Sequence, residues 1–140
     1  MYGDLRLPAQ FKINGGIMTT ALWCVLIAGL LPYFAAVTAK AGARFDNNNP
    51  RDWLAKQEGY RRRANAAQAN SFEAFPLFAA AVIVAMLTQA PQDRVDVLAL
   101  GFIAARVAYL GCYLADWAIL RSITWFVGIV CAVMIFVAGG

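Results

Sequence analysis

Four long apolar runs separated by polar segments dominate the pattern of the chain. The runs cover residues 20–39, 71–89, 97–119 and 123–138. Each has roughly the length at which an α-helix crosses the hydrocarbon core of a bilayer, about 20 residues. Only helices and closed barrels satisfy their backbone polar groups in lipid. The pattern therefore predicts an all-α integral membrane protein, a four-helix bundle with up-down order and two short later loops.

The composition agrees with this class. Hydrophobic residues make up 61% of the 140-residue chain and charged residues 14%, and the mean hydropathy is +0.59. An average soluble domain is about half apolar and about a quarter charged. We expect one membrane domain over residues 18–140. Residues 1–17 show no clear period and are predicted to be an N-terminal extension without function, the alternative being a genuine short amphipathic tail.

Basic residues gather in the polar segment between the first two runs. The seven are Lys40, Arg44, Arg51, Lys56, Arg61, Arg62 and Arg63. Arg121 joins them in the third loop, whereas the opposite side has Arg94 and, if the tail is genuine, Arg6 and Lys12. Lys and Arg mark cytoplasmic loops. We therefore expect the first and third loops in the cytoplasm and both termini across an inner or plasma membrane. This distribution explains the net charge of +4 without nucleic-acid binding.

Several chemistries are excluded by residue type. The chain has no histidine, which removes catalysis by a Ser-His-Asp or Cys-His arrangement. The three cysteines lie in three different runs without a CxxC pair, so neither a metal site nor a dithiol is predicted. The glycines follow no phosphate-binding pattern. Their expected role is close helix packing, at Gly29, Gly101, Gly111 and Gly128.

Polar residues lie at and just before the start of the second run. Asn70 and Glu73 stand three residues apart on one helix face, and Gln68 lies on the preceding turn. Polar and ionisable groups in membrane helices are costly and usually mark a site or a buried pair. The sequence therefore makes these three residues candidates for a site.

The third run carries a polar stripe at helical spacing, which ends near Arg121 before the fourth predicted helix. Its members are Arg106, Tyr109, Tyr113 and then Asp116 or Trp117. Amide, carboxylate, phenol and guanidinium groups thus gather near one membrane surface. Such a set suits a small anionic or zwitterionic ligand.

Each of these residues also has a structural interpretation. Tyr109 and Tyr113 are typical of the aromatic belt at a membrane interface. Glu73 and Arg106 suit an ion pair between two helices. Asn70 suits an interhelical hydrogen bond. The case for a site therefore rests on their combination on neighbouring helices.

The second run, with the sequence AAQANSFEAFPLFAAAVIVA over residues 66–85, resembles the MAPEG family, the membrane-associated proteins in eicosanoid and glutathione metabolism. The family pattern here is Arg-x-x-x-Asn-x-x-Glu, followed by a Phe-Pro-Leu-Phe type stretch. Asn70, Glu73 and residues 75–78 match it. The third-run stripe and the later Arg121-Ser122-x-Thr124 fit as well. The likeness spans all four runs, from about residue 18 to the end.

The resemblance implies a homotrimer with a glutathione site between neighbouring subunits near the cytoplasmic face. It implies that glutathione contacts Gln68, Asn70, Glu73, Tyr109 and Tyr113. By the same resemblance Arg106 occupies a basic position, and Arg121 stabilises the glutathione thiolate. The activity implied is that of a transferase or peroxidase acting on a lipophilic small molecule from the lipid bilayer, with Trp117, Trp125 and Phe126 as apolar lining.

One departure from the family pattern bears on binding. Ala66 stands where the family has arginine, and Arg62 and Arg63, one turn earlier on about the same face, are the candidates to replace it. A non-catalytic lipid-binding or scaffold protein of the same fold is therefore the alternative. A small multidrug transporter is a third hypothesis. It needs a membrane-embedded carboxylate, for which Glu73 is the only candidate.

Overall fold

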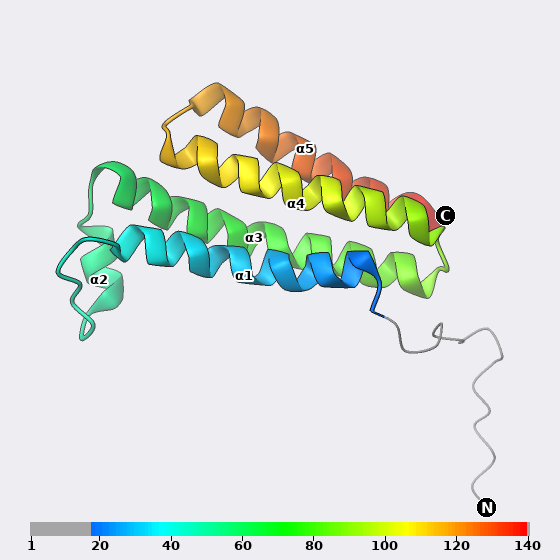
Figure 1. The fold of residues 1–140 in the computed structure, drawn as a ribbon, viewed down its shortest axis with the longest axis horizontal. Helices are drawn as coiled ribbons and strands as arrows, with labels where there is room; N and C mark the ends of the chain where they lie inside the picture. Colours follow the sequence, from blue (N-terminus) through cyan, green and yellow to red (C-terminus); the bar gives the residue numbers. More distant parts are fainter. Residues whose placement is uncertain (1–17, 140) are drawn as a thin grey trace, which may run out of the picture.

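Four long antiparallel helices and one short helix make up the computed structural model, which describes residues 18–139 (Figure 1). The bounds are α1 Thr20–Lys40, α2 Pro50–Ala55, α3 Gly59–Leu87, α4 Gln92–Leu114 and α5 Ala118–Phe136, followed by the 3-10 turn η1 Val137–Gly139. No strand occurs among the described residues. Each long helix, α5 taken together with η1, is long and apolar enough to span a membrane. The predicted all-α, up-down four-helix bundle is confirmed.

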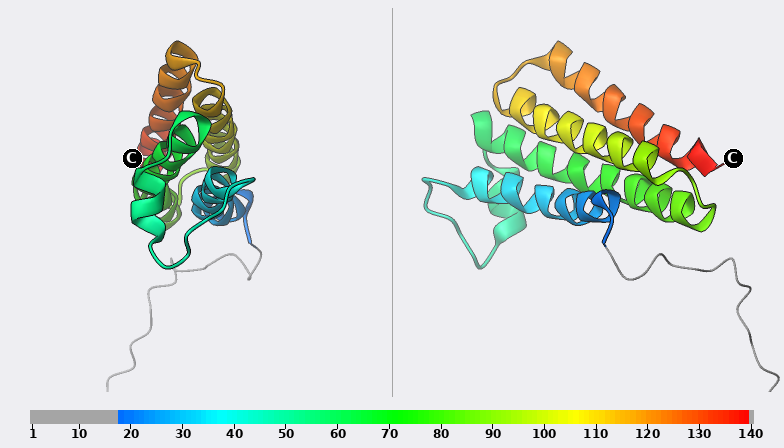
Figure 2. Two further views of the ribbon diagram at one scale, coloured as in Figure 1. Left: turned by 90° about the vertical axis from the view of Figure 1, so that its left-hand side faces the viewer. Right: turned by 45° about the vertical axis from the view of Figure 1, so that its right-hand side comes forward.

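The helices pack in two pairs. α1 lies along α3 and α5 along α4, and contacts of α1 with α4, α3 with α5 and α3 with α4 join the two pairs (Figures 1 and 2). The short helix α2 lies at one end of the bundle, where α1 ends and α3 begins (Figure 1). The same end holds the C-terminus of α4 and the N-terminus of α5. This α2 end is where the candidate site residues gather.

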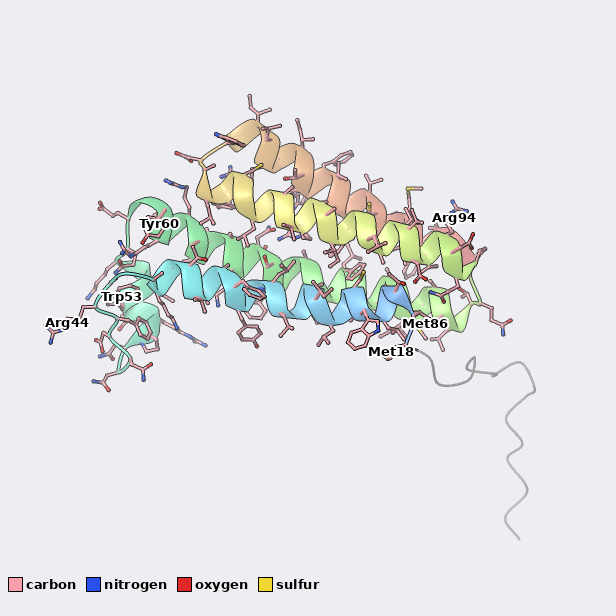
Figure 3. The ribbon with its side chains drawn as sticks, viewed as in Figure 1. Met18, Arg44, Trp53, Tyr60, Met86 and Arg94 are labelled. Carbon is pink, nitrogen blue, oxygen red and sulfur yellow. The ribbon has the colours of Figure 1, made fainter. Side chains whose placement is uncertain are left out.

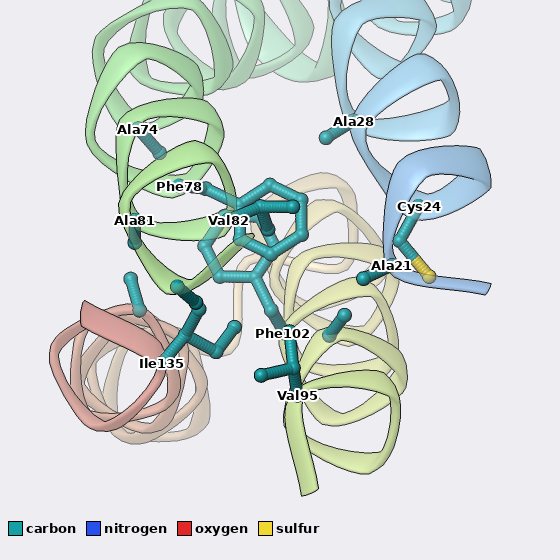
Figure 4. Close-up of a cluster of buried hydrophobic side chains, with 13 residues drawn as sticks. Ala21, Cys24, Ala28, Ala74, Phe78, Ala81, Val82, Val95, Phe102 and Ile135 are labelled. Carbon is teal, nitrogen blue, oxygen red and sulfur yellow. The ribbon is translucent and has the colours of Figure 1, made fainter. Parts of the chain in front are cut away.

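The core lies towards the opposite end and is built on two stacked phenylalanines. The rings of Phe78 on α3 and Phe102 on α4 lie 3.9 Å apart at an angle of 2° (Figure 4). Alanines surround them where the helices meet, and small residues let helix backbones approach closely in a membrane. Gly29 and Gly101 serve the same purpose, because a Cβ at either would lie 3.3 Å from a neighbouring side chain. A Cβ at Gly111 would meet nothing within 4 Å among the described residues, so Gly111 has no packing role within the chain.

Side chains from other helices satisfy both ends of α1. Asp96 Oδ1 on α4 accepts a 2.7 Å hydrogen bond from the backbone N–H of Ala21 at the start of α1. At the other end the carbonyl of Ala41 accepts hydrogen bonds from Tyr60 and Arg61, both 3.1 Å. Helix ends leave backbone groups without intrahelical partners, so these contacts fix α1 against α4 and α3.

Three helix boundaries predicted from hydropathy are wrong. α3 begins at Gly59, well before the apolar run, so the arginines 61–63, which were counted with the first loop, lie inside the helix. α4 ends at Leu114, which leaves the expected continuation of its stripe outside the helix. Arg121 lies in the second turn of α5 and not in the third loop. Polar helical turns extend beyond the apolar spans, and hydropathy does not register them.

Candidate functional site

An open pocket of about 500 Å³ lies between α3, α4 and α5 towards the α2 end. Four predicted site residues line it together: Asn70, Tyr109, Tyr113 and Arg121. The remaining lining comes from α5, namely Ser122, Trp125 and Phe126. Trp125 and Phe126 were expected as apolar lining, whereas Trp117 is exposed at the N-cap of α5, outside this lining.

Two tyrosine rings of α4 lie in a row between two guanidinium groups, one from α4 and one from α5. The Arg106 guanidinium lies 4.2 Å from the centre of the Tyr109 ring. Tyr109 meets Tyr113 edge to face at 5.5 Å, and Arg121 of α5 lies 4.5 Å from the centre of the Tyr113 ring. Cation–π contacts strengthen when the partners are shielded from water. The two tyrosines therefore hold one cation at each end of the row, with Arg121 at the pocket.

Arg106 is almost completely buried, with 4% of its surface exposed. Its Nη2 donates a 3.2 Å hydrogen bond to Ser71 Oγ, and Ser71 in turn donates to the carbonyl of Ala67 at 2.8 Å. Gly128 of α5 makes room for it, since a Cβ there would lie 3.6 Å from Arg106 Cδ. No carboxylate among residues 18–139 forms an ion pair with this guanidinium, so the alternative of a Glu73–Arg106 pair is not realised within the chain.

The three predicted site residues on α3 have different surroundings. Asn70 is partly buried, and its Oδ1 is shielded from solvent without a hydrogen-bond donor among the described residues. Glu73 is exposed and lies outside the pocket lining. Gln68 is half-buried and also lies outside the lining. Of these three, Asn70 alone faces the pocket.

Arg63, a candidate to replace the family arginine at Ala66, contacts the C-terminal end of α4. Its Nε and Nη2 donate to the carbonyl of Leu114 at 3.3 and 3.1 Å, and its Nη1 lies 3.8 Å from an oxygen of Asp116. Arg63 therefore satisfies the C-terminus of α4 instead of replacing the family arginine at Ala66. Arg62 is exposed.

Two residues that support the site were not predicted. Ser71 and Gly128 determine where the Arg106 side chain lies, through a hydrogen bond and through the space left by a missing side chain. Ser71 directly follows Asn70 at the start of an apolar run, and a polar residue at that position could have marked it as a candidate. Gly128 was expected only to bring helices close, and nothing in the sequence pairs it with Arg106.

The four apolar helices indicate an integral membrane protein of the helix-bundle class, with a polar pocket towards one end. The chain belongs to the MAPEG family, to which residues 20–140 match. No curated protein matches the chain in a sequence comparison.

Proposed function

We propose that this protein is a glutathione-dependent membrane transferase or peroxidase acting on lipophilic electrophiles or hydroperoxides. The observation that carries the proposal is the convergence of Asn70, Tyr109, Tyr113 and Arg121 on one open pocket. The family includes glutathione transferases and peroxidases alongside non-catalytic members, so membership alone leaves the activity open.

The donors and acceptors of the pocket fit the chemistry of glutathione. This tripeptide offers carboxylates, amide N–H groups and a thiol. Asn70 Oδ1 is a shielded acceptor without a donor among residues 18–139, which suits an amide N–H. The guanidinium of Arg121 and the hydroxyl groups of Tyr109 and Tyr113 suit carboxylate or thiolate groups.

Bound glutathione supplies the thiol nucleophile, and Arg121 is assigned the stabilisation of its ionised form. A free thiol has a pKa near 8.5, and lowering it to about 6.5 requires roughly 2.7 kcal/mol of preferential thiolate stabilisation. One arginine in a partly desolvated site is able to supply this amount. No general base is then needed, which suits a chain without histidine. Trp125 and Phe126 present the apolar surface for the second substrate.

The test combines calorimetric titration of glutathione with turnover of a model electrophile in detergent. Arg121→Ala should retain glutathione binding, while its thiolate fraction at pH 7 falls by roughly 25-fold if the thiol pKa returns from about 6.5 to about 8.5. Its activity should therefore recover as the pH approaches the free thiol pKa. The control is Arg94→Ala, which removes an exposed arginine at the opposite end. Full activity of Arg121→Ala at pH 7 would remove its assigned role.

Binding is tested by a double variant, Asn70→Ala with Glu73→Ala. Loss of saturable binding in this variant, with binding intact in the parent protein, supports the location of the site. Binding that survives in the double variant would place glutathione elsewhere on the molecule.

Assembly and orientation form part of the same proposal. We place the site between subunits of a homotrimer, with the α2 end in the cytoplasm. The basic residues near that end support the orientation through the positive-inside rule. Cross-linking in native membranes tests the homotrimer. The accessibility of a cysteine introduced at residue 44 tests the orientation of the α2 end.

The second candidate is a non-catalytic lipid-binding or scaffold protein of the same fold. Ala66 in place of the family arginine favours it, and so does Arg63, which is held at the end of α4. The titration separates the two candidates. If the parent protein does not bind glutathione, the non-catalytic function is the better conclusion.

A further inference from the structure

The α2 end carries the excess positive charge of the chain. Seven basic and three acidic residues lie between residues 40 and 63, which gives +4 and equals the net charge of the whole chain. At the opposite end the loop between α3 and α4 and the start of α4 hold Asp93, Arg94 and Asp96. Arg44 and Arg94 mark the two ends in Figure 3. The charge is thus strongly asymmetric along the bundle.

Four cations at the α2 end are neither hydrogen-bonded nor ion-paired within the described part of the chain. Arg44, Arg51, Lys56 and Arg62 are all exposed, and none makes a side-chain hydrogen bond or an ion pair with residues 18–139. We name these four residues the basic surface. The other three basic residues of the segment contact the protein: Lys40 an aromatic ring, and Arg61 and Arg63 backbone carbonyls.

The carboxylate of Asp46, in the loop between α1 and α2, accepts hydrogen bonds from backbone N–H groups. Asp46 accepts hydrogen bonds from the backbone of Asn48 at 2.9 Å and of Asn49 at 3.4 Å. These bonds, with that from Asn48 first, lower the pKa of Asp46, and the charge of Lys56 adds to the effect. Asp46 therefore stays ionised to shape the loop, without forming an ion pair with Lys56.

Aromatic contacts keep this segment beside the ends of the membrane helices. Lys40, the last residue of α1, places its Nζ 4.3 Å from the centre of the Phe45 ring. Phe45 packs edge to face on Trp53 of α2, with ring centres 5.2 Å apart. Tryptophan and basic residues favour the headgroup region of a bilayer. The basic surface is thus held where lipid headgroups lie.

We propose that the basic surface binds the headgroups of anionic phospholipids. The phosphodiester group of these lipids is negatively charged, and the four cations form no ion pair with residues 18–139. Guanidinium groups form paired hydrogen bonds with phosphate oxygens. Each basic residue near an anionic membrane surface strengthens the association by about fivefold. The proposal stands apart from glutathione binding, because none of the four residues lines the candidate pocket.

The experiment reconstitutes the full chain in phosphatidylcholine vesicles that contain a trace of spin-labelled phosphatidylglycerol or spin-labelled phosphatidylcholine. The motionally restricted fraction of each label gives the relative affinity for the anionic lipid. The test variant combines Arg44→Gln, Arg51→Gln, Lys56→Gln and Arg62→Gln. The matched control is Arg94→Gln, an exposed arginine at the opposite end. Labels in both leaflets make the result independent of insertion direction.

The parent protein should prefer phosphatidylglycerol several-fold, and the quadruple variant should lose most of this preference while Arg94→Gln retains it. The double variant Lys56→Gln with Arg62→Gln should lose part of the preference for phosphatidylglycerol. It tests the proposal even if the quadruple variant does not fold. In the parent protein the preference should weaken as salt shortens the Debye length from about 10 Å at 0.1 M to about 3 Å at 1 M. An absent preference in the parent, or one that the basic-surface variants retain, overturns the proposal.

Discussion

The hydrogen bond between Arg106 and Ser71 makes a stability prediction. Ser71→Ala removes the hydroxyl that accepts from Arg106 Nη2 at 3.2 Å, and leaves the guanidinium of a residue that is 4% exposed without this acceptor. Hydrogen bonds to charged groups contribute about 1.5–3 kcal/mol in soluble proteins. Interhelical hydrogen bonds in membranes average about 0.6 kcal/mol and reach about 1.7. The charge of Arg106 places the expected loss near the upper membrane value, about 1.5 kcal/mol.

The assay is reversible unfolding in mixed detergent micelles, with circular dichroism as the readout. Ser122→Ala is the matched control, because Ser122 is exposed and its hydroxyl donates to the carbonyl of Ala118 one turn earlier in the same helix. This control should change the free energy of unfolding by less than about 0.5 kcal/mol.

A double-mutant cycle isolates the pair itself. Arg106→Met keeps much of the side-chain length and removes the charge, and in that background Ser71→Ala should cost little. The expected coupling energy between the two positions is about 1 kcal/mol, within the range found for residues in contact. If Ser71→Ala and Ser122→Ala are equally stable, or the coupling is zero, Ser71 does not hold Arg106.

Three further substitutions test other contacts. Asp96→Ala removes the acceptor for the Ala21 N–H at the start of α1, and should lower the free energy of unfolding by about 0.5–2 kcal/mol in the same assay. Gly128→Ala should be tolerated, because its Cβ would lie 3.6 Å from Arg106 Cδ, whereas Gly128→Leu should displace Arg106 and weaken glutathione binding in a titration. Phe78→Ala removes a fully buried ring stacked on Phe102 and should cost about 3–5 kcal/mol; a loss below about 1 kcal/mol would show that the stack contributes little.

Local properties of the sequence were enough to predict the membrane class, the number of spans and the up-down order. Hydropathy and helical spacing depend on neighbouring residues, and the membrane restricts the possible folds to very few. The spacing of Arg106, Tyr109 and Tyr113 also predicted their common face, and their ring contacts agree with it. The Asn70 and Glu73 motif correctly indicated the family.

The tertiary structure decided which residues meet and which face the pocket. Arg106 finds Ser71 35 residues away, Arg63 finds Leu114 51 residues away, and Asp96 finds Ala21 75 residues away. Glu73 fits the sequence motif as well as Asn70, and Gln68 was expected beside them, yet the packing of α3 against α4 and α5 leaves Glu73 and Gln68 outside the pocket lining. Partner choice of this kind depends on how whole helices pack side by side. A pattern within one helix contains no information about the rotation or the register of its neighbour.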